Sequence, residues 1–168
     1  MKPENILKGR MAESLVEELL KRCGNKVYRF GYEAVLQNLT QLDKSFDRES
    51  EVGQRISSIP DFIVINQNKI SIVEVKFRTD PVLYEKDTKK LKLIEEFWRA
   101  KIVLVTPIGP YFRVSTPPYF DGKGNLNSIP IEKDSDMGIT PDILKEFNEL
   151  VEKYFLIEKK YKEKDLPF

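Results

Sequence analysis

The sequence predicts a mixed α/β domain in which a central sheet carries helices on its faces. Three observations support this class. Apolar residues recur at helical spacing in the segments 10–23, 85–98 and 140–155. Short runs rich in β-branched residues lie between them. The continuous apolar run KIVLVT at 101–106 suits a central strand that is covered on both faces. The expected order is helix, strand, an additional helix, two strands, helix, strand and a C-terminal helix.

The first helix is predicted over residues 10–23, because its apolar residues fall on one side at about 100° per residue. They are Met11, Ala12, Leu15, Val16, Leu19, Leu20 and Cys23. Gly24 provides a natural C-terminal stop. Glu13 falls at the edge of the apolar arc, and Glu17 is expected one turn further on, toward solvent.

Three segments of different character follow this helix. Residues 26–32 predict a strand, and residues 34–42 predict a helix. Residues 44–58, with the sequence KSFDRESEVGQRISS, are polar. They predict a mobile loop that becomes ordered only with nucleic acid.

The runs IPDFIVI and ISIVEVKF predict a hairpin with strands at 60–66 and 70–77. Glu74 and Lys76 lie inside the second strand and point the same way, since strand side chains alternate between faces. A carboxylate and an ammonium are costly to bury there unless they are paired or bind an ion. If the strands pair, Asp61 approaches Glu74 across a solvated cleft. Two carboxylates without His or Cys suit a hard divalent cation.

The C-terminal half continues the alternation of helices and strands. Residues 85–98 predict a second amphipathic helix, 101–106 and 111–115 predict strands, and 116–138 are expected to be mostly loop. Thr140-Pro141-Asp142 begins a third helix that extends to about residue 155, since it combines an N-cap, a proline and an early acid.

Length and charge set the broad class. The 168 residues predict one domain over 1–168, with a core at about 8–115 and a C-terminal extension at about 116–168. The absence of a long apolar stretch and of a signal peptide, with Cys23 alone, predicts a cytoplasmic protein without a membrane partner. The net charge of +1 is unlike that of a strongly basic nucleic-acid binder.

The sequence contains no histidine. This excludes Ser-His and Cys-His triads, His-ligated zinc sites and His general bases. The motif Asp134-Ser-Asp136-Met-Gly138 does not complete a calcium loop, because Lys145 stands where such a loop needs its final Glu. Carboxylate and lysine chemistry remains.

Pro60-Asp61 followed by Glu74-x-Lys76 on consecutive strands resembles the PD-(D/E)xK nuclease superfamily. The segment KGRMAESLVEELLKRCGNKVYRFG is similar to the start of the archaeal Holliday junction resolvases, and KKLKLIEEFWRAKIVLVT is similar to the helix and strand that close their core. The resemblance covers about residues 8–106. Between Tyr32 and Pro60 this chain is longer than those resolvases.

The resemblance implies a restriction-endonuclease-like fold and a site for Mg²⁺, with Mn²⁺ as a substitute. Asp61, Glu74 and the backbone carbonyl of Val75 would bind the ion. Lys76 would orient the attacking water or stabilise negative charge, and Glu13 would support the metal site. Three arginines are the candidate contacts to nucleic acid: Arg10, Arg29 and Arg78.

The implied activity is metal-dependent hydrolysis of DNA phosphodiester bonds, often by a homodimer acting on two strands. Two activities are compatible with the resemblance. One is resolution of branched DNA such as a Holliday junction, and the other is cleavage of other DNA by a nuclease of the same fold. A non-catalytic module that binds DNA or protein is the alternative from another class. A nuclease acting on RNA is a third hypothesis.

Overall fold

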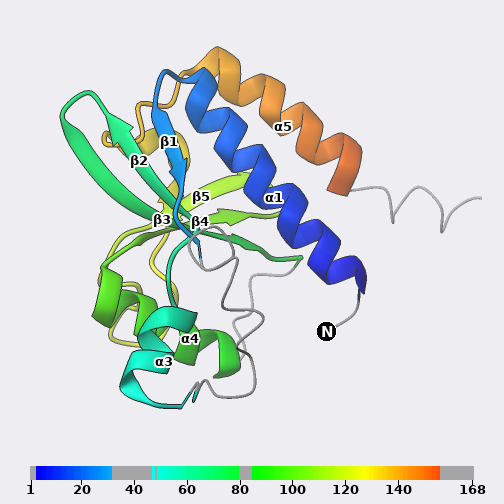
Figure 1. Cartoon of the computed structure of the whole chain (residues 1–168). Helices are drawn as coiled ribbons and strands as arrows, with labels where there is room; N and C mark the ends of the chain where they lie inside the picture. Colours follow the sequence, from blue (N-terminus) through cyan, green and yellow to red (C-terminus); the bar gives the residue numbers. More distant parts are fainter. Residues whose placement is uncertain (1–2, 32–46, 48, 80–84, 156–168) are drawn as a thin grey trace, which may run out of the picture.

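A computed structural model describes residues 3–31, 47, 49–79 and 85–155, except for the side chains of residues 85 and 86. Figure 1 shows a central sheet with helices on both of its faces. The helices are α1 (Pro3–Arg22), α3 (Glu51–Ser57), α4 (Glu85–Trp98) and α5 (Pro141–Phe155). The short 3-10 helix η2 spans Ile131–Lys133. Within the described residues, no helix is long and apolar enough to cross a membrane.

The sheet has six strands, and their order across the sheet is their order in the sequence. They are β1 (Lys26–Arg29), β2 (Phe62–Asn66), β3 (Lys69–Phe77), β4 (Lys101–Val105), β5 (Phe112–Ser115) and β6 (Ile129–Pro130). All neighbours pair antiparallel except β3 and β4, which are parallel and are joined through α4. A helix, a three-stranded meander and a helical crossover to a parallel strand make the predicted restriction-endonuclease-like topology, so the predicted fold class is confirmed.

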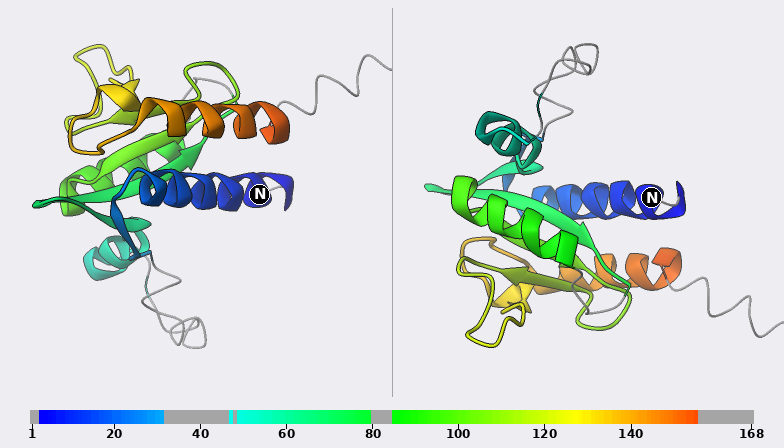
Figure 2. Two further views of the ribbon diagram at one scale, coloured as in Figure 1. Left: turned by 90° about the horizontal axis from the view of Figure 1, so that it is seen from above. Right: turned by 90° about the horizontal axis from the view of Figure 1, so that it is seen from below.

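Two hydrophobic clusters hold the layers together. On one face, residues of α1 and α5 pack against the alternate strand residues Val73, Val75 and Val103. On the other face, Leu91 and Ile94 of α4 pack with Ile72, Ile102 and the buried Tyr119. Figure 2 shows α1 and α5 side by side. Because strand residues alternate between faces, the residues next to Val73 and Val75 in β3 lie on the side of α4.

Helix α1 begins at Pro3 rather than at residue 10. Proline is favoured at the first helical position, and Glu4 pairs with Lys8 at 2.7 Å one turn later. Ile6 and Leu7 are exposed, so the first turns lack the buried stripe from which the helix was predicted. The predicted stop is confirmed, since Gly24 has a φ of +87°, the left-handed conformation that glycine adopts at helix ends.

The prediction of a loop over residues 44–58 is wrong for its described part, because residues 51–57 form α3. Ser50 caps this helix by accepting a hydrogen bond from the N–H of Gly53 at 3.0 Å. Ser58 is buried and accepts a hydrogen bond from Trp98 Nε1 at 3.3 Å. A polar segment is thus held against α4 by a cap and side-chain contacts that apolar periodicity does not report. The helix expected over 34–42 lies outside the described residues.

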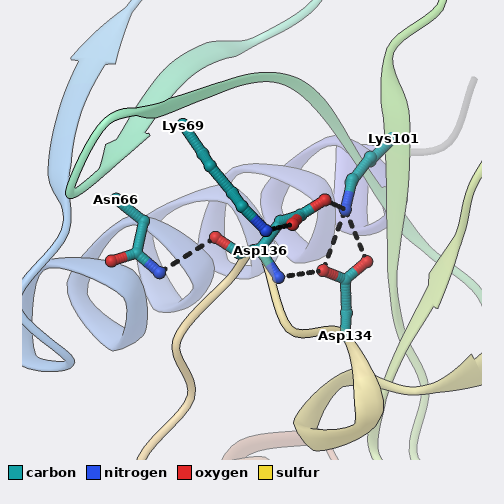
Figure 3. A network of polar contacts seen from close by, with 5 residues as sticks. All are labelled: Asn66, Lys69, Lys101, Asp134 and Asp136. Carbon is teal, nitrogen blue, oxygen red and sulfur yellow. Dashed lines mark hydrogen bonds and ion pairs between the residues drawn. The ribbon is translucent and has the colours of Figure 1, made fainter.

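The segment between η2 and α5 is fixed to the sheet by an ion-pair network (Figure 3). Lys101 donates to Asp134 at 2.8 and 2.6 Å and to Asp136 at 2.9 Å, while Lys69 pairs with Asp136 at 2.6 Å. Asn66 also donates to the backbone carbonyl of Asp136 at 3.0 Å. Ammonium groups therefore contact the acids that faintly resembled a calcium loop. The network joins the tip of the β2–β3 hairpin to the C-terminal third of the chain.

Candidate active site

The candidate active site lies where the ladder between β2 and β3 ends. The last paired residues are Phe62 and Val73. Beyond them, β3 continues from Glu74 to Phe77 beside β4. Asp61 stands directly before β2, so the divergence of the two strands brings its side chain next to this unpaired edge of β3.

Asp61 is fixed by backbone groups of both neighbouring strands. The N–H groups of Phe30 and Gly31, just after β1, donate to the Asp61 carbonyl at 2.8 and 3.1 Å. The N–H of Val75 donates to Asp61 Oδ2 at 2.7 Å. The side chain of Asp61 thus takes the place of a β2 carbonyl on β3, and its carboxylate is positioned on rigid elements.

Glu74 is almost fully buried, with 1% of its surface exposed. Its Oε1 forms an ion pair with Lys76 and lies 3.3 Å from the Nζ of Lys90, which α4 supplies. Its Oε2 has no hydrogen-bond partner among the described residues. Burial alone would raise the pKa of Glu74, but the charges of Lys76 and Lys90 outweigh it and lower the pKa below its ordinary value.

The expected solvated cleft is therefore wrong for Glu74. Its neighbours in β3, Val73 and Val75, point into the core under α1, so Glu74 points toward the opposite face. There α4 covers it, and Lys90 reaches its carboxylate from that helix. A truncation of Glu74 would consequently leave the largely buried ammonium of Lys76 without this partner.

The electrostatics of Asp61 differ from those of Glu74. Burial, and then the charge of Glu74, raise the pKa of Asp61 to about 7, and Glu13 adds a smaller contribution in the same direction. Lys76 and the Val75 N–H oppose this shift without cancelling it. Two carboxylates with pKa values moved in opposite directions therefore share one site, and Asp61 titrates near neutral pH.

Lys76 completes the group that the hairpin was predicted to assemble. Its side chain is 19% exposed. Burial would lower the pKa of its ammonium, but the charges of Glu74 and Asp61 raise the pKa above its ordinary value. Lys76 is therefore a protonated group beside both carboxylates, able to donate hydrogen bonds and unable to serve as a metal ligand.

Glu13 lies on α1, which contacts β3. Its charge acts on Asp61, so the structure brings it to the neighbourhood of the site. Within the described residues, no three acidic or cysteine side chains are grouped closely enough to hold a metal ion. Glu13 is thus no third ligand in this arrangement, and its effect on the site is electrostatic.

Glu17 was expected toward solvent, and this is wrong, because the residue is buried. Its carboxylate accepts from Arg29 at 2.5 Å and from Lys21 at 2.8 Å. Burial would raise the pKa of Glu17, but these two cations lower it below the ordinary value. The pair between Glu17 and Arg29 joins α1 to β1 one turn after Glu13, so it fixes the helix that carries Glu13.

The three arginines proposed for nucleic-acid contact differ in their surroundings. Arg29 pairs with Glu17, although its side chain is 57% exposed. Arg78 follows β3 and pairs with Asp87 of α4 at 2.7 Å, and its buried Nε has no hydrogen-bond partner within the described residues. Arg10 is exposed on α1. The structure therefore gives Arg29 and Arg78 structural partners, and the charge of Arg78 also acts on Lys76 beside the two carboxylates.

The donor set at Asp61 and Glu74 fits a hard divalent cation. The donors are carboxylate oxygens, which Mg²⁺ prefers, and two acidic groups are a usual protein contribution to such a site. Glu74 Oε2 is buried without a partner in the described part of the chain, and a cation would provide one. Mutual repulsion of the two carboxylates, which contributes to the raised pKa of Asp61, would also be relieved by a positive ion.

Lys90 is the site residue that sequence reasoning missed. It belongs to a lysine-rich stretch of α4, and the helical period does not reveal which of these lysines faces the sheet. The crossover from β3 to a parallel β4 places α4 over Glu74. This arrangement, which depends on the parallel pairing of β3 with β4, brings Lys90 to Glu74.

No protein-family model matches this chain, and no curated protein matches its sequence. Among solved structures, Hjc, a Holliday junction resolvase from the archaeal hyperthermophile Archaeoglobus fulgidus, is similar, with 17% identity and a TM-score of 0.41. The match covers 82% of this chain and 98% of that chain.

Proposed function

We propose that this chain is a divalent-metal-dependent nuclease that hydrolyses phosphodiester bonds in DNA. The observation that carries the proposal is that the charges of Asp61 and the buried Glu74 act on each other at the edge of β3, with the Lys76 ammonium acting on both carboxylates. A carboxylate that is buried with an unpartnered oxygen is expensive for a fold to keep unless that oxygen has a ligand.

Asp61 and Glu74 would hold Mg²⁺, with Mn²⁺ as a substitute, and the Val75 carbonyl is the proposed third protein oxygen. The bound ion would polarise the scissile phosphate and lower the pKa of a bound water. Lys76 donates hydrogen bonds from the neighbourhood of both carboxylates, so it would orient the attacking water or stabilise the developing negative charge. Glu13 would tune the charge of Asp61 from α1.

The proposed substrate is DNA, including branched forms such as four-way junctions, and the proposed acting species is a homodimer. The near-neutral net charge of +1 means that affinity for phosphates must come from local cations rather than from the whole molecule. Arg10 and Arg29 are the exposed candidates among the three arginines. Arg29 and Arg78 would have to contact phosphate while keeping Glu17 and Asp87 as partners.

A second candidate function is a non-catalytic binding module. It is favoured by the same ion pairs, because Lys76 and Lys90 already neutralise Glu74 with no metal bound. In such a module the buried charges would serve only to fix the β3–α4 geometry. The two candidates differ in whether a divalent cation stabilises the protein.

The experiment combines a cleavage panel with thermal unfolding of the full chain. Labelled linear, flapped and four-way DNA, with a matched RNA duplex, are incubated with the protein in Mg²⁺ or in EDTA. A nuclease of the proposed kind cuts DNA in Mg²⁺ only, and Mn²⁺ raises its melting temperature, since a ligand that binds only the folded state stabilises it. No cutting and no Mn²⁺-induced shift would assign the chain to the binding module, and cutting of RNA alone would change the substrate.

A further inference from the structure

Two lysines contact one oxygen of Glu74, and they are not equivalent. Lys76 is two residues away in the same strand, and its side chain is 19% exposed. Lys90 comes from α4 at 3.3 Å, and its side chain is 47% exposed. Both act on Oε1, while Oε2 has no partner within the described residues. The inner lysine is built into the sheet, whereas the outer lysine can leave the carboxylate for solvent at little cost.

A divalent cation at Asp61 and Glu74 would add two positive charges next to these two ammonium groups. Two like charges a few ångströms apart repel strongly in a partly buried site. The half-exposed Lys90 can lower this repulsion by turning away, because its long side chain reaches water directly. Lys76 is confined between the carboxylates and the sheet and has no comparable route.

We propose that Lys90 is a displaceable counter-ion for Glu74, which neutralises the carboxylate in the metal-free protein and competes with the divalent cation for it. The inference rests on the proposed function, because it assumes that Asp61 and Glu74 hold the ion. It assigns Lys90 a positioning role: the residue keeps a buried acid compensated until metal binds, and it lowers the affinity for that metal. Lys90 thereby sets the metal concentration at which the site fills.

The test compares Mn²⁺ binding by isothermal titration calorimetry for the wild type, Lys90→Met and Lys92→Met at fixed ionic strength and pH. Lys92 is the matched control, because it is exposed on the same helix and its removal changes the net charge equally. Lys90→Met should bind Mn²⁺ about tenfold more tightly than the wild type, while Lys92→Met should stay within about twofold. Lys90→Arg, which keeps the charge, should bind like the wild type.

A second readout separates competition from a merely structural role. Without metal, Lys90→Met should unfold at a lower temperature than Lys92→Met, since Glu74 keeps only one of its two cations. Saturating Mn²⁺ should then raise its melting temperature by more than it raises that of the wild type.

Equal Mn²⁺ affinities of Lys90→Met and Lys92→Met, with a wild type that binds Mn²⁺, would overturn this inference and leave the proposed function intact. A wild type that binds no Mn²⁺ would instead overturn the proposed function, and this inference with it.

Discussion

At the residue scale, the site consists of two acids that the fold treats in opposite ways. Glu74 is buried with two cations, which lower its pKa. Burial and the charge of Glu74 instead raise the pKa of Asp61 to about 7. The folded protein thus keeps one permanent negative charge and one that appears near neutral pH. A bound cation would favour the ionised form of Asp61, so metal binding should release a proton at pH values below about 7.

The shift at Asp61 predicts how stability depends on pH in the metal-free protein. Between pH 4 and 7 the folded state binds a proton that the unfolded state has lost, so Asp61 makes stability fall as pH rises through this window. The change from the ordinary pKa of 3.8 to about 7 corresponds to a loss of about 4 kcal/mol at most.

Urea unfolding of the wild type and Asp61→Asn at several pH values, in EDTA, checks this prediction. The amide keeps an oxygen that can accept the Val75 N–H and carries no charge. Asp61→Asn should therefore gain stability relative to the wild type as pH rises from 4 to 7.5. A difference between the two proteins that does not change with pH would mean that Asp61 titrates normally.

At the scale of elements, α1 is joined to the sheet by a buried acid that a helical projection misplaces. Glu17 was assigned toward solvent because it lies outside the apolar arc of the helix. In the fold, β1 passes beside it, and Arg29 and Lys21 satisfy its carboxylate. Helical periodicity identifies only the face of a helix that packs against apolar residues. Strand β1 covers Glu17 because β1 pairs with β2, and the periodicity of α1 contains no information about that pairing.

We consequently predict that Arg29 contributes to the stability of the fold through its ion pair with Glu17. Arg29→Met removes one of the two cations on the buried Glu17 and should lower the free energy of unfolding by about 1 kcal/mol. Lys26→Met is the matched control, since Lys26 is exposed on the same strand, and it should change stability by less than about 0.5 kcal/mol. Chemical unfolding of both variants measures this difference.

If Arg29→Met were as stable as Lys26→Met and weakened only DNA binding, Arg29 would be a phosphate contact rather than an anchor of α1.

The prediction of a loop over residues 44–58 failed because apolar periodicity does not report every helix. Residues 51–57 carry almost no apolar period, yet Ser50 caps a helix there, and Arg55 lies over the ring of Phe97 at 5.0 Å. Caps and cation–ring contacts stabilise short helices without a hydrophobic stripe.

At the scale of the whole molecule, the strongest sequence signals were those with a clear period. The hairpin, the helix at 85–98, the strand at 101–105 and the C-terminal helix were predicted nearly to their bounds. The proximity of Pro60-Asp61 to Glu74-x-Lys76 was also predictable, because a local hairpin joins the two strands that carry these motifs. Lys90 and Glu17 could not be found in this way, because their positions depend on the parallel pairing of β3 with β4 and on β1.

Helix α5 packs in the same hydrophobic core as β3, the strand that carries Glu74. Leu144, Phe147 and Val151 of α5 pack in the cluster that also contains Val73 and Val75 of β3. The Lys101 network fixes the preceding segment to β4 and to the hairpin. Leu91 and Ile94 of α4 pack on the other face of the sheet. The strand that carries Glu74 is therefore held from both faces, which keeps a charged group in place where a flexible strand would let it reach water.

The central claim is that Glu74 carries metal-dependent cleavage, and the most direct test is the Mg²⁺-dependent rate of cleavage by Glu74→Gln. This change keeps the shape of the buried side chain and removes the charge, and Glu96→Gln, at an exposed position of α4, is its matched control. On DNA that the wild type cuts, with the fold of each variant verified by circular dichroism, Glu74→Gln should be at least about a hundredfold slower. Glu96→Gln should match the wild type. Cleavage by Glu74→Gln at the wild-type rate would contradict the assignment of this site.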